Sequence, residues 1–315
     1  MSHEADRPAA PARPFGEPLP IHLVGNVNLD IVLGPVQPWP RAGTERIVAH
    51  QEVRAGGAAG VAAMALQGLG APFRLHARVG DDAFGELVQR DMGRAGAQLE
   101  PVPGSTAYSV GITHPDGERT FLTHLGHLKR LDVDGLAEDL TVGPPGLVLV
   151  CGYFLMPPLR GAAGLRLMRS ARDAGHRVLF DSGWPSEGFD AAVRGELDAL
   201  LPWIDVALPN VAEALGWTAA ADLEAALRAL QARQRGGGRA LVKRGPAGAS
   251  WLEDGSSRTA APPAAPIVDS IGAGDCFNAA LLAALSRGSG LGAAAGAAVR
   301  YASAVLARQP RDYRG

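Results

Sequence analysis

The sequence predicts an α/β protein with a central, mostly parallel β-sheet flanked by helices and a second, small β-sheet. From residue 147 onward, short apolar strand patterns alternate with helical patterns, which is typical of parallel strands joined by crossover helices. Residues 105–124 break this alternation, because two strand patterns there flank the turn sequence Pro115-Asp116-Gly117. We therefore expect this segment to belong to the small sheet.

Each expected element follows from its local pattern, taken in chain order. An apolar run at residues 21–25 predicts a buried first strand, and the Ala-rich stretch at residues 60–68 predicts a helix that ends at Gly70. The other strand patterns cover residues 45–53, 73–79, 108–113, 119–123, 147–150, 178–180, 206–208, 240–243 and 249–252. The other helical patterns cover residues 83–93, 159–174, 190–200, 221–233, 279–285 and 291–308.

Composition indicates an ordinary globular protein. The chain has 315 residues, of which 47% are hydrophobic and 20% charged, and its formal net charge is −2. This charge gives no electrostatic reason to expect nucleic acid or an anionic membrane as a partner. Two cysteines argue against a disulfide framework, and no apolar run reaches membrane-spanning length. We expect a cytoplasmic protein, with the proline-containing residues 1–18 as a disordered leader.

The most informative stretch is residues 269–278, which read Asp-Ser-Ile-Gly-Ala-Gly-Asp-Cys-Phe-Asn and lead into a helical pattern. Backbone amides at a helix start lack internal partners and, with the helix dipole, form an anion site. Gly272, Ala273 and Gly274 would supply these amides. Asp275 has two interpretations: it is either a helix N-cap, or a general base that deprotonates an attacking hydroxyl beside a bound phosphate.

The same stretch resembles the C-terminal signature of the ribokinase-like (pfkB) family of carbohydrate and nucleoside kinases. That signature reads Asp-(Thr/Ser)-x-Gly-Ala-Gly-Asp-x-Phe, and every fixed position matches. The resemblance extends over residues 21–308, and it implies a lid that closes over substrate and makes a homodimer contact. The implied division is an α/β catalytic domain at residues 19–35, 56–104 and 125–315, and a β-sheet lid at residues 36–55 and 105–124.

Residues near the first strand and at a glycine pair resemble the family's substrate-binding positions. Asp30 matches the sugar-binding aspartate, and an ionised carboxylate can accept hydrogen bonds from two sugar hydroxyls. Asn28 is either a sugar contact or ordinary turn chemistry. Gly56 and Gly57 would let the backbone approach the substrate closely. Arg119 would face the substrate from the lid, with an exposed hairpin arginine as the alternative.

A second pair of polar residues matches the family's Asn-x-x-Glu motif. Asn210 and Glu213 have the spacing of a capping box, which is the simpler interpretation. In the family this motif is associated with phosphate and with Mg²⁺ bound through water, and magnesium prefers such hard oxygen ligands. The resemblance thus implies Asn210 as a nucleotide-binding residue and Glu213 as a residue that binds Mg²⁺ through water. A monovalent cation is a further cofactor that the sequence leaves open.

The remaining nucleotide-binding candidates come from a late turn and the last helix. Residues 242–249 resemble the glycine turn that borders ATP in the family, with Gly245 and Gly248 as nucleotide contacts. Lys243 would touch phosphate, or else be a solvated surface lysine. Ser303 falls where many relatives have an asparagine close to the base.

Three departures from the family argue against ribose as the substrate. Ala58, Val61 and Tyr153 stand where ribokinases have polar sugar contacts, and a site built to bond a hydroxyl discriminates strongly. The sequence contains no Gly-Lys dipeptide, which excludes a Walker A loop. We therefore expect an ATP-dependent kinase that phosphorylates a primary hydroxyl of another sugar, with Mg²⁺ as cofactor. The alternatives are a nucleoside kinase of the same fold and a catalytically silent sugar-binding relative.

Overall fold

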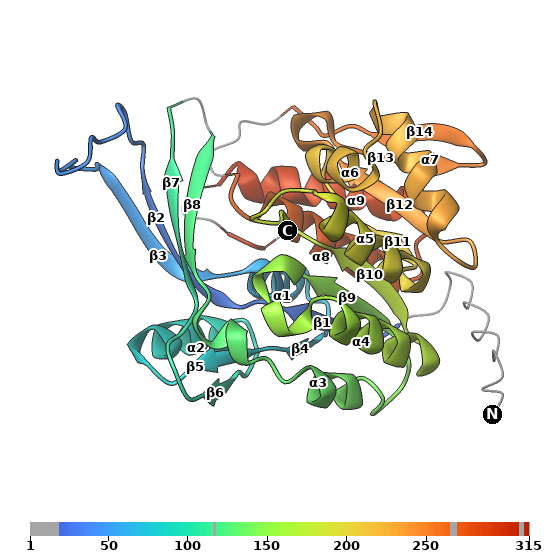
Figure 1. Ribbon diagram of the computed structural model, residues 1–315, viewed down its shortest axis with the longest axis horizontal. Helices are drawn as coiled ribbons and strands as arrows, with labels where there is room; N and C mark the ends of the chain where they lie inside the picture. The colour runs from blue at the N-terminus through green and yellow to red at the C-terminus, as the bar shows by residue number, and fades with distance from the viewer. Residues whose placement is uncertain (1–18, 116–117, 265–269, 309–311, 315) are drawn as a thin grey trace.

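The computed structural model describes residues 19–115, 118–264, 270–308 and 312–314, and it confirms the predicted fold class. An eight-stranded sheet with the order β14-β13-β12-β11-β10-β9-β1-β4 forms its centre (Figure 1). All neighbours from β4 to β12 are parallel, whereas β13 and β14 are antiparallel at one edge. The strands are β1 (Ile21–Gly25), β4 (Arg74–His76), β9 (Leu147–Cys151), β10 (Arg177–Asp181), β11 (Val206–Ala207), β12 (Arg239–Lys243), β13 (Ala249–Glu253) and β14 (Ser256–Ala260). The expected leader at residues 1–18 lies outside the described residues.

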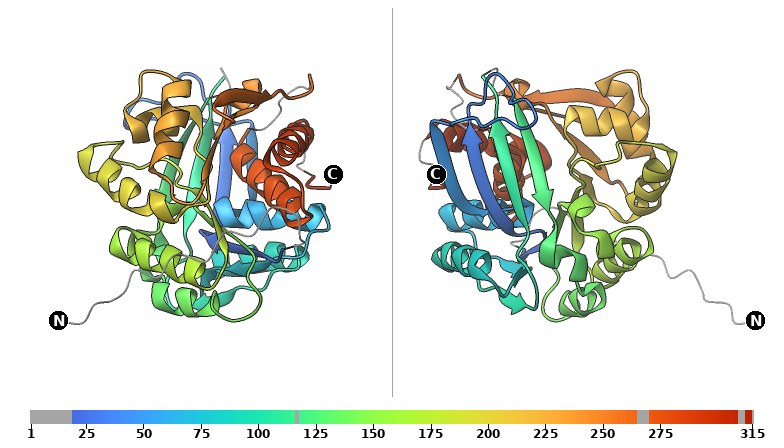
Figure 2. Two further views of the ribbon diagram at one scale, coloured as in Figure 1. Left: turned by 90° about the vertical axis from the view of Figure 1, so that its right-hand side faces the viewer. Right: turned by 60° about the vertical axis from the view of Figure 1, so that its left-hand side comes forward.

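Helices cover both faces of this sheet (Figure 2). One face packs against α1 (Ala58–Gly68), α8 (Ala273–Ser286) and α9 (Leu291–Leu306), and α2 (Ala83–Arg94) joins the same hydrophobic core beside α1. The other packs against α3 (Val133–Asp139), α4 (Ala162–Asp173), α5 (Ala191–Leu200), α6 (Val211–Thr218) and α7 (Leu223–Arg233). Short 3₁₀ helices are η1 (Gly126–Arg130), η2 (Tyr153–Leu155), η3 (Pro157–Leu159), η4 (Leu201–Trp203) and η5 (Gly245–Ala247). Within the described ranges, no helix has the length and apolar character needed to cross a bilayer.

Alternation along the parallel strands explains the two helical layers. Successive side chains of a strand point to opposite faces of its sheet. Leu23 and Leu149 belong to the core on the α1, α8 and α9 side, whereas Val24 and Val150 belong to the core on the α3 to α7 side. Strands that are apolar on both faces need cover on both sides, which is why the chain returns through helices between strands.

The predicted second sheet is also present, with the order β3-β2-β7-β8. Its strands are β2 (Asn28–Gly34), β3 (His50–Gly56), β7 (Tyr108–Thr113) and β8 (Arg119–His124), and we call it the small sheet. The pair β2 and β7 is parallel, and the two outer pairs are antiparallel. A separate pair of short parallel strands consists of β5 (Arg78–Gly80) and β6 (Glu100–Val102).

The strands of the small sheet differ in two ways from the segments expected for a lid. Residues 28–34, which we expected in the catalytic domain, form an inner strand of the small sheet. Residues 36–49 contribute no strand, so the strand expected at 45–53 starts only at His50. The chain passes from β1 to β2 through Asn26 and Val27 alone, so the two strand patterns run together in the sequence. The division into catalytic domain and lid stays a prediction.

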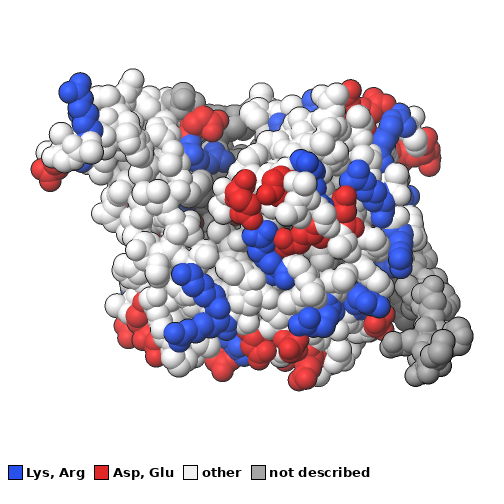
Figure 3. Space-filling view, in the orientation of Figure 1, with Lys and Arg blue, Asp and Glu red and all other residues white. Residues whose placement is uncertain are grey.

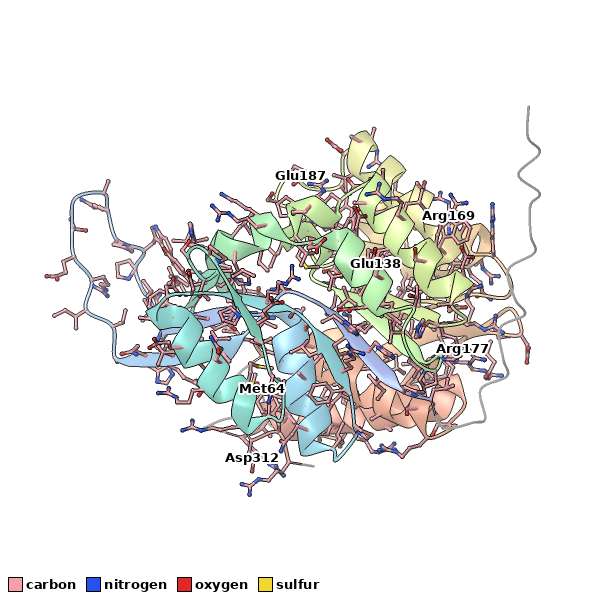
Figure 4. All side chains as sticks on the ribbon, turned by 90° about the horizontal axis from the view of Figure 1, so that it is seen from below. Met64, Glu138, Arg169, Arg177, Glu187 and Asp312 are labelled. Atoms are coloured by element: carbon pink, nitrogen blue, oxygen red, sulfur yellow. The ribbon has the colours of Figure 1, made fainter. Side chains whose placement is uncertain are left out.

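The C-terminal segment 312–314 packs along α1. The Tyr301 hydroxyl of α9 lies 2.6 Å from the Tyr313 carbonyl oxygen and 3.1 Å from the Ala65 carbonyl oxygen of α1. Met64 and Asp312 line one surface cavity on this side of the molecule (Figure 4). The last described residues therefore join α1 and α9.

Three buried histidines meet beside β1 and β4 and just before β10. His22 of β1 and His76 of β4 share a hydrogen bond, with 3.1 Å between His22 Nδ1 and His76 Nε2. The His176 ring lies edge-on to the His22 ring. Burial, together with His176, His76 and Arg74, lowers the pKa of His22 to about 4, and burial also lowers the pKa of His76. Both rings are therefore neutral in the folded protein near pH 7.

This cluster predicts acid-sensitive stability. Because the folded-state pKa of His22 lies below its unfolded value of about 6.5, the unfolded chain takes up the proton first as pH falls. The contribution is complete above pH 6.5 and is lost as pH falls toward 4, so a drop from pH 7 to pH 5 should cost about 2 kcal/mol through His22. Urea unfolding at both pH values should show a smaller loss for His22→Asn than for the wild type.

An exposed histidine of the small sheet provides the matched control. His50→Asn, at the start of β3, should leave the difference in unfolding free energy between pH 7 and pH 5 unchanged. Equal pH dependence in His22→Asn and the wild type would show that His22 does not carry the effect.

Candidate active site

The glycine-rich signature forms the start of α8, as the sequence predicts. Gly272 is the N-cap residue and has a φ of 76°, a left-handed conformation that favours glycine. The first helical hydrogen bond runs from the Cys276 amide to the Gly272 carbonyl, at 3.0 Å. The Ala273 amide donates to the Ser270 carbonyl at 3.3 Å. The Gly274 amide precedes the first helical bond and belongs to the N-terminal turn, where the helix dipole favours an anion.

Asp275 lies in the first turn of α8, but it is not the N-cap, because Gly272 holds that position. The simple capping interpretation of Asp275 is therefore wrong. Burial, followed by the negative charges of Asp275 and Asp181, raises the pKa of the Cys151 thiol at the end of β9. Asp275 is thus close to the carboxyl edge of the parallel sheet, where β9 and β10 end.

A buried ion pair lies directly beneath this turn. Lys243 Nζ donates to Asp181 Oδ2 at 2.5 Å, and Asn278 Nδ2 donates to the same oxygen at 2.6 Å. A Cβ atom added to Gly274 would approach Lys243 Nζ to 3.2 Å. Burial disfavours the charged ammonium, but the carboxylates of Asp181, Glu213 and Asp275 outweigh it and raise the pKa of Lys243. Lys243 is therefore not a solvated surface lysine.

Sequence reasoning missed Asp181 and Asn278. Asp181 ends the strand predicted at 178–180, so its place on the carboxyl edge was available from the sequence. Asn278 follows Gly274 by four residues on α8, which puts both on one helix face. The pairing itself joins residues 97 positions apart, and no local pattern indicates it.

Asn210 and Glu213 form the complete capping box of α6. Asn210 Oδ1 accepts from the Glu213 amide at 2.9 Å, and Glu213 Oε2 accepts from the Asn210 amide at 2.8 Å. Burial and the neighbouring Asp181 raise the pKa of Glu213 to about 7, although Lys243 opposes them. The capping role is confirmed, and the pair also faces the edge that carries Asp181 and Lys243.

The predicted substrate residues form a chain of hydrogen-bonded side chains along β2. Asn26 Nδ2 donates to Asn28 Oδ1 at 2.8 Å, and Asn28 Nδ2 donates to Asp30 Oδ1 at 2.7 Å. Asn28 thereby fixes the orientation of the Asp30 carboxylate. All three side chains are buried.

Gly56 and Gly57 face this chain of side chains. A Cβ atom at Gly56 would overlap the Asp30 carboxylate, and one at Gly57 would lie 2.6 Å from Asn28 Oδ1. Gly57 also has a φ of 83°. Glycine is therefore required at both positions because the backbone passes close to Asp30 and Asn28. The sequence had led us to expect that the substrate makes this close approach.

The small sheet reaches the signature through Arg119. The Arg119 guanidinium on β8 donates to the Ser270 hydroxyl, just before α8. A Cβ atom at Gly111 of β7 would lie 3.5 Å from Ile271 Cδ1. By strand register Gly111 and Asp30 lie on the same face of the small sheet, because Asp30 pairs with Ser109 and side chains alternate. That face, with Asp30, therefore turns toward the start of α8.

The expected nucleotide turn lies between β12 and β13. Gly245 and Gly248 bound η5, with φ values of 55° and 83°. Gly245 is exposed, whereas a Cβ atom at Gly248 would overlap the Ala260 carbonyl of β14. The Ser303 hydroxyl donates to the Val299 carbonyl one turn earlier on α9, at 2.9 Å.

Tyr153, one of the departures from ribokinases, does not line the site. Its ring is fully buried in the core on the α3 to α7 side, and its hydroxyl donates to Glu196 Oε1 at 2.5 Å. Burial and the contact with Glu196 raise the pKa of Tyr153. Tyr153 therefore gives no evidence against ribose as the substrate, and only Ala58 and Val61 remain as departures from the ribokinase sugar contacts.

Comparisons with known proteins agree with this geometry. Residues 21–310 match the profile described as pfkB family carbohydrate kinase. An uncharacterised sugar kinase of Escherichia coli K12 is 26% identical over 279 residues, which are 85% of this chain and 82% of the relative.

Two solved structures establish the fold. Arabidopsis thaliana ribokinase complexed with ribose and ATP superposes with a TM-score of 0.76 at 24% identity, covering 92% of this chain and 93% of that one. Adenosine kinase from Sinorhizobium meliloti superposes with a TM-score of 0.78 at 21% identity, covering 94% and 96%. The fold is ribokinase-like, and the chain is a kinase that belongs to the pfkB family of carbohydrate kinases.

Proposed function

We propose that this kinase transfers the γ-phosphate of ATP to a primary hydroxyl of a sugar. The observation that carries the proposal is Asp275, a carboxylate in the first turn of a helix that starts with a glycine-rich anion site. Such a site attracts phosphate, so a carboxylate beside it serves as a base and not as an anion ligand. Asp275 removes the hydroxyl proton while the amides of residues 272–274 stabilise the transferring phosphoryl group.

ATP would extend along the carboxyl edge of the parallel sheet. The exposed Gly245 and the buried Gly248 form a tight turn that can border the nucleotide without side chains in the way. The amino end of α6 at Asn210 offers further positive dipole potential. Ser303 is the weakest member of this set, because its hydroxyl already bonds within α9.

The residues at this edge fit a magnesium ion. Glu213 and Asp181 are buried carboxylates whose proximity raises the pKa of Glu213, and a nearby cation would relieve their repulsion. Magnesium keeps several waters and needs few protein ligands, so Glu213 acting through water suffices. When bound, the ion neutralises charge on the phosphates. Among the described residues, no group of three His, Cys, Asp or Glu side chains could hold a metal by itself.

The sugar would lie between the small sheet and the start of α8. The bond from Asn28 holds the Asp30 carboxylate in one orientation, which lowers the entropic cost of binding two hydroxyls. Arg119 closes the other side of this space through its contact with Ser270. The sugar is thus held between the binding residues of the small sheet and the base on α8.

A substrate panel tests the acceptor class. With ATP and Mg²⁺, ADP release should be fastest with a sugar, because Asp30 and Asn28 form a compact acceptor for hydroxyl pairs. Adenosine and inosine are the nucleoside controls. Faster turnover of either nucleoside than of every sugar would make the protein a nucleoside kinase of the same fold.

Replacing the base separates binding from chemistry. Asp275→Asn should lower kcat by roughly 10²- to 10⁴-fold, because an amide cannot accept the proton. ATP affinity should hold or rise, since a negative charge beside the γ-phosphate is removed. Turnover and nucleotide affinity are measured on the same folded variant. Turnover near the wild-type value would instead support a catalytically silent relative.

The outer face of the small sheet predicts a homodimer. Register aligns Val53, Ile31, Val110 and Leu122 in one row across all four strands, and Val53 and Leu122 are 42% and 59% exposed. Figure 3 shows few charged side chains over this part of the molecule. Exposed edges and apolar rows favour pairing. Light scattering at micromolar concentration should give a dimer, and Leu122→Asp should shift it toward monomer; a monomeric wild type would contradict the prediction.

A further inference from the structure

The Lys243, Asp181 and Asn278 cluster joins three distant parts of the chain beneath the anion site. Lys243 ends β12, Asp181 ends β10 and Asn278 lies in the second turn of α8. The side chains of Lys243 and Asp181 are only 11% and 9% exposed, and Asn278 is fully buried. Both nitrogens donate to one oxygen of Asp181, at 2.5 Å and 2.6 Å. The carboxylate therefore bridges the sheet and the helix.

The cluster contacts α8 at two successive turns. A Cβ atom at Gly274 would approach Lys243 Nζ to 3.2 Å and Lys243 Cδ to 3.7 Å, so the lysine packs against the first turn. Asn278, four residues later on the same helix face, donates to Asp181, which also accepts from Lys243. The amino end of α8 is thus held against the ends of β10 and β12 by one lysine and one carboxylate.

Lys243 offsets part of the negative charge that three carboxylates place at this edge. Asp181, Glu213 and Asp275 all act on Lys243 strongly enough to raise its pKa despite burial. Three carboxylates alone would repel an anionic nucleotide at the place where the helix start should attract it. A buried ion pair contributes little net stability after desolvation, so its position beneath the anion site points to a role in chemistry.

We propose that Lys243 is a positioning residue for phosphoryl transfer. Its buried ammonium, held by Asp181 and Asn278, fixes the first turn of α8, and with it Asp275 and the amides of residues 272–274, relative to the sheet. It also supplies a permanent positive charge within this anionic edge. This role rests on the proposed function, because it concerns the same site. It differs from a direct phosphate contact, because the ammonium acts from beneath the turn.

The experiment separates positioning from simple neutralisation of Asp181. Lys243→Met leaves a buried carboxylate without its cation and should lower both the melting temperature and kcat. In Lys243→Met/Asp181→Asn both charges are gone, so the melting temperature should return toward the wild-type value. In this double variant kcat should stay about 10- to 100-fold low, since small displacements of catalytic groups cost that much, while KM for the sugar should change little.

Lys129→Met is the matched control, because Lys129 is the other lysine of the chain and is exposed on η1. It should match the wild type in melting temperature, kcat and KM. Recovery of kcat together with melting temperature in the double variant would overturn the proposal, because Lys243 would then only neutralise Asp181.

A third variant keeps the test informative if the double variant does not fold. Lys243→Arg retains the positive charge and can still pair with Asp181, but its larger planar head would displace the first turn of α8 at Gly274, which packs against the lysine side chain. The melting temperature should stay near the wild-type value while kcat falls about 10-fold or more. A wild-type kcat in Lys243→Arg would overturn the proposal. Failure of the proposed function appears differently, as absent sugar-dependent ADP release in the wild type or full turnover in Asp275→Asn.

Discussion

Neighbouring parallel strands all run in one direction, so the residues that follow them must meet at a single edge of the sheet. In this kinase that edge brings together Cys151, Asp181 and Lys243, the last residues of β9, β10 and β12, with Asn210 close by at the start of α6. Polar groups placed there are far apart in the chain and close in space. The shared direction of the strands therefore determines where the site lies, and the individual residues determine its chemistry.

Much of this fold was predictable because its signals are local. Apolar runs with helical periods between them located the parallel strands, and the carboxylate and glycines of residues 272–275 marked the start of α8. The change of sheet between β1 and β2 was not predictable. Only Asn26 and Val27 separate the two strands, and polar residues at this point are equally compatible with one strand that continues and with a chain that enters a second sheet.

The site was predictable to a smaller extent, because long-range pairings leave no local pattern. Gly56 and Gly57 were predicted to approach the substrate, and in the structure the atoms that exclude a side chain there include those of Asp30 and Asn28. Tyr153 was aligned with a sugar contact, whereas its ring turns into the core toward Glu196. A position in an alignment does not fix the direction in which its side chain points, since the local backbone decides that.

The two-residue junction between β1 and β2 also has a mechanical meaning. Asp30 is carried by the small sheet, whereas Asp275 is carried by a helix packed on the large sheet. This junction is short, and the Asn26 side chain accepts a hydrogen bond from the Ala58 amide at the start of α1. The backbone between the two sheets therefore has little conformational freedom. Any rotation of one sheet against the other must therefore pivot at this junction, and it changes the distance between Asp30 and Asp275.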